Sequence, residues 1–188
     1  FGQAALSGGQ ITGNTAAEYG GGVMVNRDVA SFGQSGASGV SGNYADYGGG
    51  IWVYETSPVI RACHVTGNMA HHEGGGIWVG GGMPLIDNTV VSDNASSQSG
   101  GGIVASYASP TIQNSSIANN TARDYGGGLV TWGASQPLLL TTTIAANTAR
   151  WGGGLYVGDD VALHISSSRI EGNSAQQAAG VRIAFATL

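Results

Sequence analysis

The chain has 188 residues, of which 34 are glycine and only 9% are charged, and its formal net charge is −5 with no lysine. A typical soluble domain has about 25% charged residues and about 7% glycine. The acidic balance without a basic cluster argues against nucleic-acid partners, and no apolar run is long enough for membrane insertion. A content of 41% hydrophobic residues argues against a disordered glycine-rich linker.

Several motifs recur in a fixed order along the chain. The first is an aliphatic residue, two others and an asparagine, which ends at Asn14, Asn43, Asn68, Asn94, Asn120, Asn147 and Asn173. A glycine triplet follows, and its last member is Gly22, Gly50, Gly76, Gly102, Gly128, Gly154 or, in a degraded seventh copy, Gly180. The triplets are spaced by 28 residues once and then by 26 residues throughout. An aliphatic run comes directly after each triplet, and most repeats then have a proline-marked apolar run such as Pro58-Val59-Ile60.

Each repeat therefore holds three short β-prone runs separated by glycine, proline, asparagine and serine. A repeat of 26 residues is too short for strand–helix–strand units with ordinary loops, and a regular repeat of this length is typical of a stacked coil. We predict an all-β fold: one right-handed parallel β-helix over residues 1–188, with about seven rungs of about 26 residues and no separate capping domain. Stacked rungs spaced by about 4.8 Å would form a rod.

The repeated glycines and asparagines are interpreted as structural. Glycine at a turn permits positive φ angles and close stacking of backbones. Asparagine tolerates the left-handed region and bonds to nearby backbone groups, so seven equivalent asparagines are predicted to form an amide ladder.

These motifs carry a family resemblance. The repeat, Gly-Gly-Gly-[Ile/Val/Leu] with [Ile/Val]-x-x-Asn, resembles those of bacterial surface and secreted β-helix proteins of the pectin-lyase-like superfamily. It is also similar to the repeats of the chlamydial polymorphic outer-membrane proteins, which pair Gly-Gly-Ala-aliphatic with Phe-x-x-Asn. The resemblance covers nearly the whole chain and implies an exported passenger or adhesin domain, located at the cell surface or outside the cell.

Alternation after each triplet assigns the faces of that strand. The first and third positions are mostly aliphatic and are predicted to point inward. The second position must point outward, yet it is mainly apolar or aromatic: Met24, Trp52, Trp78, Val104, Val130 and Tyr156. This outward column is interpreted as a contact surface for a protein or a surface glycan, with mutual support between neighbouring rungs as the alternative. Tyr19, Tyr47, Tyr125 and Trp151 directly precede triplets and are expected to extend that surface around a corner.

Candidates for chemistry are few. His64, His71, His72 and Glu73, with Asp46 one rung away, form the densest ionisable cluster, but neighbouring histidines at a turn are expected to be solvated, so no metal site and no cofactor are predicted. The nearest carboxylate pairs are Asp159 with Asp160 and Asp87 with Asp93, and neither lies among basic residues, so no catalytic residue is assigned. Cys63 is expected to be a buried, unreactive thiol.

The sequence thus favours a non-catalytic extracellular structural or adhesive β-helix. Two routes to self-association are open: contact through the outward column, or head-to-tail stacking of the open ends into a filament. The alternative to the filament is that the chain is a segment of a larger surface protein, because a cut at whole repeats gives two ends that match in the same way. The alternative is a carbohydrate-binding or carbohydrate-active β-helix resembling polysaccharide lyases and hydrolases. Ice binding ranks last, because Thr141-Thr142-Thr143 is isolated.

Overall fold

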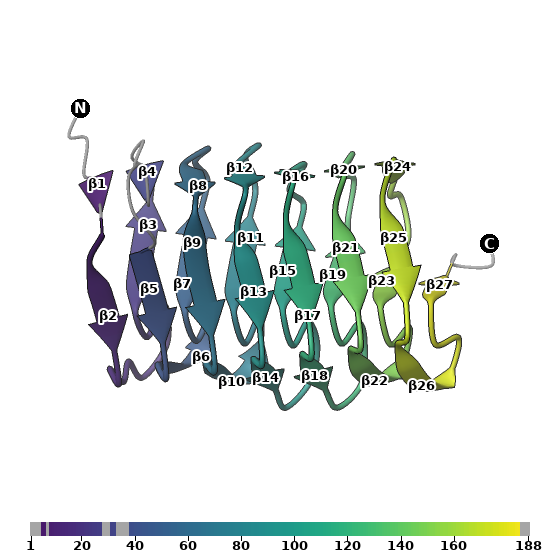
Figure 1. Cartoon of the computed structure of the whole chain (residues 1–188), viewed down its shortest axis with the longest axis horizontal. Coiled ribbons are helices and arrows are strands. Elements are labelled where there is room, and N and C mark those ends of the chain that lie inside the picture. Colours follow the sequence, from purple (N-terminus) through teal and green to yellow (C-terminus); the bar gives the residue numbers. More distant parts are fainter. Residues whose placement is uncertain (1–4, 7, 28–30, 33–37, 185–188) are drawn as a thin grey trace.

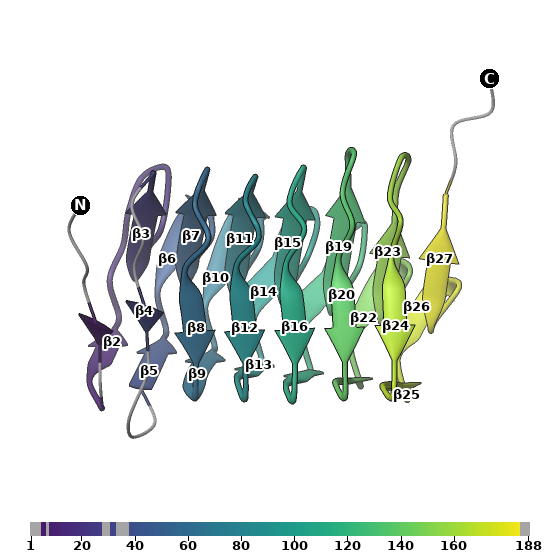
Figure 2. The same ribbon diagram turned by 90° about the horizontal axis from the view of Figure 1, so that it is seen from above.

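The computed structural model describes residues 5–6, 8–27, 31–32 and 38–184, and every regular element among them is a β-strand. The strands stack in parallel along one axis, so that each turn of the chain lies directly beside the next (Figures 1 and 2). The predicted parallel β-helix is therefore confirmed. Since the described residues contain no helix, they contain none that is long and apolar enough to cross a membrane.

Each turn visits four sheets, which we number in the order in which the chain reaches them. Sheet 1 comprises β1 (Ala5–Leu6), β4 (Ser31–Phe32), β8 (Val59–Arg61), β12 (Leu85–Asp87), β16 (Thr111–Gln113), β20 (Leu138–Leu140) and β24 (His164–Ser166). Sheet 2 comprises β2 (Gln10–Thr12), β5 (Ser38–Ser41), β9 (Cys63–Thr66), β13 (Val90–Ser92), β17 (Ser116–Ala118), β21 (Thr143–Ala145) and β25 (Arg169–Glu171).

The other two sheets lie on either side of the glycine triplets. Sheet 3 comprises β6 (Tyr44–Tyr47), β10 (Met69–Glu73), β14 (Ala95–Ser96), β18 (Thr121–Ala122), β22 (Thr148–Trp151) and β26 (Ser174–Gln177). Sheet 4 comprises β3 (Val23–Asn26), β7 (Ile51–Tyr54), β11 (Ile77–Gly80), β15 (Ile103–Ser106), β19 (Leu129–Trp132), β23 (Leu155–Val157) and β27 (Val181–Ile183). We number the rungs 1 to 7 by their repeated asparagine, from Asn14 to Asn173.

The expectation of three strands in each repeat was wrong by one, because sheet 3 occupies the short segment between the asparagine and the glycine triplet. That segment is polar and lacks a long apolar run, so its β-propensity is weak. It is extended because its backbone pairs with the rungs on both sides, as in Met69 with Tyr44 and with Ala95.

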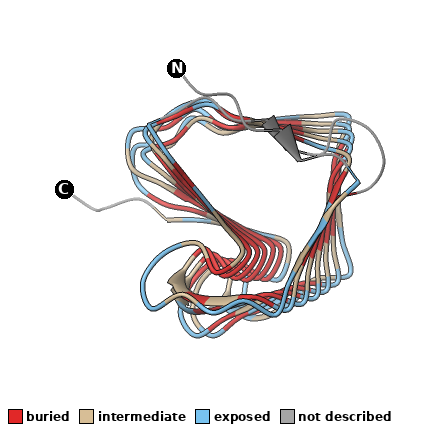
Figure 3. Cartoon of the chain, turned by 90° about the vertical axis from the view of Figure 1, so that its left-hand side faces the viewer, coloured by how far each residue is buried: buried red, intermediate tan, exposed pale blue. Residues whose placement is uncertain are grey.

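The core lies inside the coil, where sheets 1 and 2 contribute one column of aliphatic side chains each and sheet 4 contributes two. The end-on view in Figure 3 shows the buried residues superposed from rung to rung. The predicted inward positions are confirmed in the middle rungs, and the fully buried side chains include Ile51, Ile60, Ile77, Ile86, Ile103, Ile112, Ile117, Leu129, Leu139, Ile144 and Leu155. Burying one such side chain contributes about 1.5–3 kcal/mol, so this column is the main source of stability.

The three glycines of a triplet have different roles. The first has a positive φ, as in Gly74 (φ 67°), and the equivalent Ala178 of the degraded copy keeps it (φ 58°). The second and third have no positive φ, but a Cβ at either would run into the backbone of the next rung, as Gly50 would meet the carbonyl oxygen of Gly76 at 2.6 Å. Close stacking therefore requires glycine at the predicted third position in rungs 1 to 6, whereas a Cβ on Gly180 would meet only Ile170, at 3.9 Å.

The predicted asparagine ladder is confirmed. In each interior rung the Oδ1 atom accepts two bonds from the asparagine of the preceding rung, one from its backbone N–H and one from its Nδ2. For Asn94 these come from Asn68 at 2.9 and 3.0 Å, while its own Nδ2 donates to Val65 O and to Asn120 Oδ1. The ladder asparagine was expected to adopt the left-handed conformation, but this is wrong. The positive φ belongs to the residue before it, which is Gly13, Gly42, Gly67, Asp93, Asn119, Ala146 or Gly172.

A second, shorter ladder was not predicted. At the corner between sheets 1 and 2, a hydroxyl side chain in one rung accepts a bond from the backbone N–H in the preceding rung. Thr89 N donates to Ser115 Oγ at 3.1 Å, and Thr142 N donates to Ser168 Oγ at 3.0 Å. Cys63 occupies the same column one rung before Thr89, and it is fully buried.

Burial raises the pKa of the Cys63 thiol to about 11, although a hydrogen bond to the backbone of His64 lowers it. At pH 8 only about one thiol in a thousand is then ionised, and the sulfur is also inaccessible. The folded protein is expected to be inert to a chromogenic disulfide reagent at pH 8 and to release one equivalent of product in guanidinium chloride. Rapid reaction of the folded chain would contradict the buried position of Cys63.

Candidate functional site: an aromatic groove

The predicted outward column does point away from the core, but it is not a continuous exposed stripe. Met24 is 56% exposed and Trp78 and Tyr156 are partly exposed, whereas Trp52 is 7% exposed and Val104 and Val130 are fully buried. Val104 and Val130 therefore cannot belong to a surface that contacts a partner, and the expectation is wrong for these two residues. Trp52 offers very little surface of its own.

The aromatic members of this column are partly covered by the residue that precedes a glycine triplet, which is Tyr19, Tyr47, Glu73, Ser99, Tyr125, Trp151 or Gln177. These residues form a ladder of their own from rung to rung. The positive φ of the first glycine turns the chain sharply, so this ladder folds over the outer face of sheet 4. Tyr125 then packs on Tyr156 with ring centroids 4.7 Å apart, and Tyr19 packs on Trp52 at 4.8 Å.

The covering is incomplete in rungs 1 to 3, where large aromatic rings gather. Trp52 stacks on Trp78 of the next rung (5.7 Å between centroids, 8° between planes) and on Tyr54 (5.4 Å, 14°). Tyr47 meets Trp78 edge-on at 6.3 Å. Mutual support between rungs, the alternative interpretation of this column, thus has direct geometric evidence at Trp52 and Trp78.

Between these rings lies a hollow of about 420 Å³, lined by Tyr19, Asn26, Tyr47, Trp52, Tyr54 and Trp78. A second hollow of about 270 Å³ shares Tyr54 and Trp78 with it and extends over Gly80 and Gly81 to Ser106 and Tyr107. We call the two together the aromatic groove. Its floor is low at Gly80, where any Cβ would collide with the Trp78 ring, and Tyr107 at its far rim is 71% exposed.

Some polar groups at the groove already form hydrogen bonds within the chain. Glu73 accepts a bond from Trp78 Nε1 at 3.2 Å, and burial raises the pKa of its carboxyl while this bond lowers it. Burial raises the pKa of Tyr47, with a further contribution from the charge of Glu73. The hydrogen bond to Glu55 raises the pKa of Tyr54. Trp52 Nε1 is buried and has no hydrogen-bond partner among the described residues.

The carboxylates considered for catalysis do not line the aromatic groove. Asp87 is bound by Arg61 Nε at 2.9 Å, by Gln113 and by Asn114, and its pKa is lowered, chiefly by the Asn114 bond. This contribution to stability is complete above the ordinary pKa of an aspartate and is lost as the pH falls through the lowered value. Asp93 is instead the left-handed residue before the ladder Asn94, and Asp159 and Asp160 are exposed.

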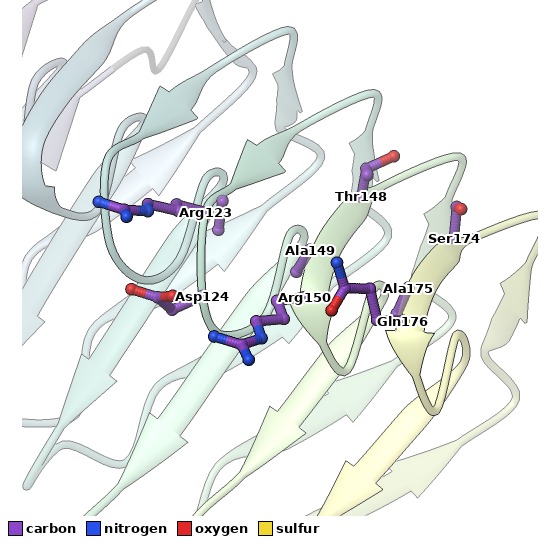
Figure 4. A pocket seen from close by; sticks show the side chains of 9 residues that line it. Arg123, Asp124, Thr148, Ala149, Arg150, Ser174, Ala175 and Gln176 are labelled. Carbon is purple, nitrogen blue, oxygen red and sulfur yellow. The ribbon is translucent and has the colours of Figure 1, made fainter.

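A larger hollow than those of the aromatic groove lies over sheet 3 of rungs 5 to 7 and has a volume of about 620 Å³. Figure 4 shows Arg123, Asp124 and Arg150 extending from neighbouring rungs beside short side chains such as Thr148 and Ser174. The Arg150 guanidinium stacks 4.2 Å above the Trp151 ring. Only one residue of this lining, Asp124, is acidic, so it offers no pair of carboxylates for glycoside hydrolysis.

Comparison with known proteins agrees with the fold. A family model described as the right-handed β-helix region matches residues 49–187. The chain belongs to this right-handed β-helix family, and the predicted handedness is confirmed. Searches of curated proteins and of solved structures found no significant match.

Proposed function

We propose that this protein is a non-catalytic structural or adhesive β-helix that acts outside the cell and binds protein through its aromatic groove. The observation that carries the proposal is a cluster of solvent-accessible rings, Tyr19, Tyr54, Trp78 and Tyr107, on the outer face of the coil. Further along the same face the chain itself buries Val104 and Val130, so this cluster of rings is confined to rungs 1 to 4. Exposed aromatic rings that cluster on one face are typical of protein interfaces. The extracellular location rests on the resemblance to exported β-helix proteins.

A second copy of the same chain is the partner that we expect. The groove is next to Met24, which is 56% exposed, so the apolar surface extends along rungs 1 to 4 on one side of the rod. Two copies that associate through the same patch about a twofold axis form a closed dimer, in which every contact occurs twice. Sideways association of this kind needs no exposed strand edge.

Replacing Trp78 by serine is expected to weaken self-association by at least about tenfold, which is about 1.4 kcal/mol. Trp78 is the better test residue than Trp52, because it lines both hollows and has more exposed surface. Sedimentation velocity over a concentration series would measure the change. Trp132→Ser is the matched control, since Trp132 lies on sheet 4 at rung 5 and lines neither hollow.

A wild-type chain that stays monomeric at all concentrations, or two variants that associate equally, would contradict this proposal. Circular dichroism of both variants would show that the fold is retained, because a loss of structure would remove the groove together with the residue.

A glycan-binding groove is the second candidate. Asn26, Glu55 and Ser106 line the two hollows beside the rings, and the combination of aromatic faces with a few polar groups is typical of sites for small polar ligands. The stacking of Trp52 between Tyr54 and Trp78 leaves it little ring face for a sugar, which is why we rank protein first. A glycan array probed with the wild type and with Trp78→Ser would distinguish the two candidates.

A further inference from the structure

Two histidines and an aspartate converge on the outer side of sheet 3, away from the core. Asp46 lies on β6 in rung 2, and His71 and His72 lie on β10 in rung 3. Each residue offers one ligand atom, and these three atoms all lie within 4.8 Å of one another. The sequence predicts the two histidines to be solvated neighbours at a turn, where no spacing fixes them on one side, whereas the structure places both on a strand.

A β-bulge explains why both imidazoles reach the same carboxylate. Ala70 pairs with Ala45 and Glu73 pairs with Tyr47, so two residues on β10 stand against the single residue Asp46 on β6. The count is visible in the repeat: rung 2 has four residues between its ladder asparagine and its glycine triplet, and rung 3 has five. A bulge re-aims side chains, and here it turns His71 and His72 toward one neighbour.

The distances suit a metal ion. His71 Nδ1 lies 3.3 Å from Asp46 Oδ1, which is long for a strong charge-assisted hydrogen bond. Two ligands of a tetrahedral zinc ion, each about 2.0–2.1 Å from it, lie about 3.4 Å apart. The ring centroids of His71 and His72 are 4.5 Å apart, and the His71 and Asp46 side chains are 58% and 35% exposed, so small rotations can close the remaining gaps.

A further contact can orient one of the ligands. Gln98 of rung 4 lies with its Nε2 2.8 Å from His72 Nδ1. With the amide turned so that its oxygen accepts from the Nδ1–H group, the lone pair of the His72 Nε2 atom is free to bind a metal. Metal-binding histidines in proteins usually have such a partner on the other ring nitrogen.

We propose that Asp46, His71 and His72 form a binding site for a divalent transition-metal ion, Zn²⁺ in particular, with water completing the coordination. Imidazole nitrogens favour zinc over calcium and magnesium, which prefer oxygen ligands. The site joins rung 2 to rung 3, so a bound ion cross-links two turns of the coil. The His72 ring packs 5.2 Å from the Tyr47 ring, which lines the aromatic groove, but the proposed metal site does not rest on the function proposed for that groove.

Isothermal titration of the chelator-treated protein with Zn²⁺ near neutral pH tests the site. We expect one ion per chain, and binding at least about tenfold weaker in each of His71→Ala, His72→Ala and Asp46→Asn. His64→Ala is the matched control: His64 is exposed on β9 of the same rung, and its binding should equal that of the wild type.

Thermal unfolding gives a second measurement. Zn²⁺ is expected to raise the midpoint of the wild type and of His64→Ala, because an ion that binds only the folded chain stabilises it, and to raise that of Asp46→Asn by less. A wild type that binds no Zn²⁺, or binding that His64→Ala reduces as much as His71→Ala does, would overturn the proposal. Equal binding by the wild type and Asp46→Asn would also overturn it.

Discussion

Replacing Asn94 by alanine is expected to lower the free energy of unfolding by at least about 3 kcal/mol. Asn94 is 1% exposed, and its side chain makes four hydrogen bonds to rungs 3 and 5. The alanine leaves the backbone N–H of Asn68 without its partner and removes one hydrogen bond from the Val65 carbonyl, in a region that water does not reach. The Nδ2 atom of Asn68 and the Oδ1 atom of Asn120 each lose one bond and keep one, to Val40 O and from Asn94 N. Urea unfolding followed by circular dichroism would measure the loss.

The control is Asn14→Ala at the first rung of the same ladder. Asn14 is exposed, and its side chain makes one ladder bond, from Nδ2 to Asn43 Oδ1 at 3.0 Å, while its backbone N–H keeps its own bond to the same atom. Its replacement should cost about 1 kcal/mol or less. Equal losses in the two variants would mean that the ladder contributes nothing beyond local turn formation.

Replacing Gly101 by alanine is the second change with a large expected effect, a loss of about 3 kcal/mol or more. Gly101 is the middle glycine of its triplet and has no positive φ, so the cost is not one of backbone conformation. The added methyl group would instead collide with the backbone of Thr121 in the next rung, at its nitrogen, carbonyl carbon and oxygen. A backbone atom that is hydrogen-bonded on both sides cannot move away cheaply.

Gly180→Ala is the matched control for this variant. It also substitutes a triplet glycine without a positive φ, but its Cβ would meet only Ile170 Cγ2 at 3.9 Å, which is ordinary contact. Its unfolding midpoint in urea should stay within experimental error of the wild type. A comparable loss in both variants would show that glycine is required for a reason other than the approach of the next rung.

The sequence predicts the coil and its internal ladders well, because these depend on residue types that recur at one spacing. Asn94 and Gly76 have equivalents in almost every rung, and each has one physical role that only its residue type performs. The hydroxyl ladder of Thr89 and Ser115 could have been predicted from the same spacing. Threonine and serine alternate at this position, so the repeat is harder to recognise in the sequence than a column of one residue type.

The outer surface could be predicted only in part. The alternation along sheet 4 correctly predicts that Val104 points away from the core, yet Val104 is fully buried. The exposure of this column also depends on the path of the segment before each triplet, which the positive φ of the first glycine directs back over sheet 4. The convergence of His71 and His72 depends on one extra residue in rung 3 relative to rung 2. A difference of one residue is visible in the sequence, but its effect on side-chain direction needs the pairing of the two strands.

The middle glycine of each triplet also sets the distance between neighbouring turns. In rungs 1 to 6 this position faces a carbonyl oxygen of the following rung, with no room for a methyl group. In rung 7 the position is taken by Ala179, as the bond from Gly154 N to Ala179 O shows. At the spacing that the other rungs share, a methyl group at this position would meet a carbonyl oxygen of a following rung. The middle glycine therefore fixes how closely two turns of this coil can approach each other.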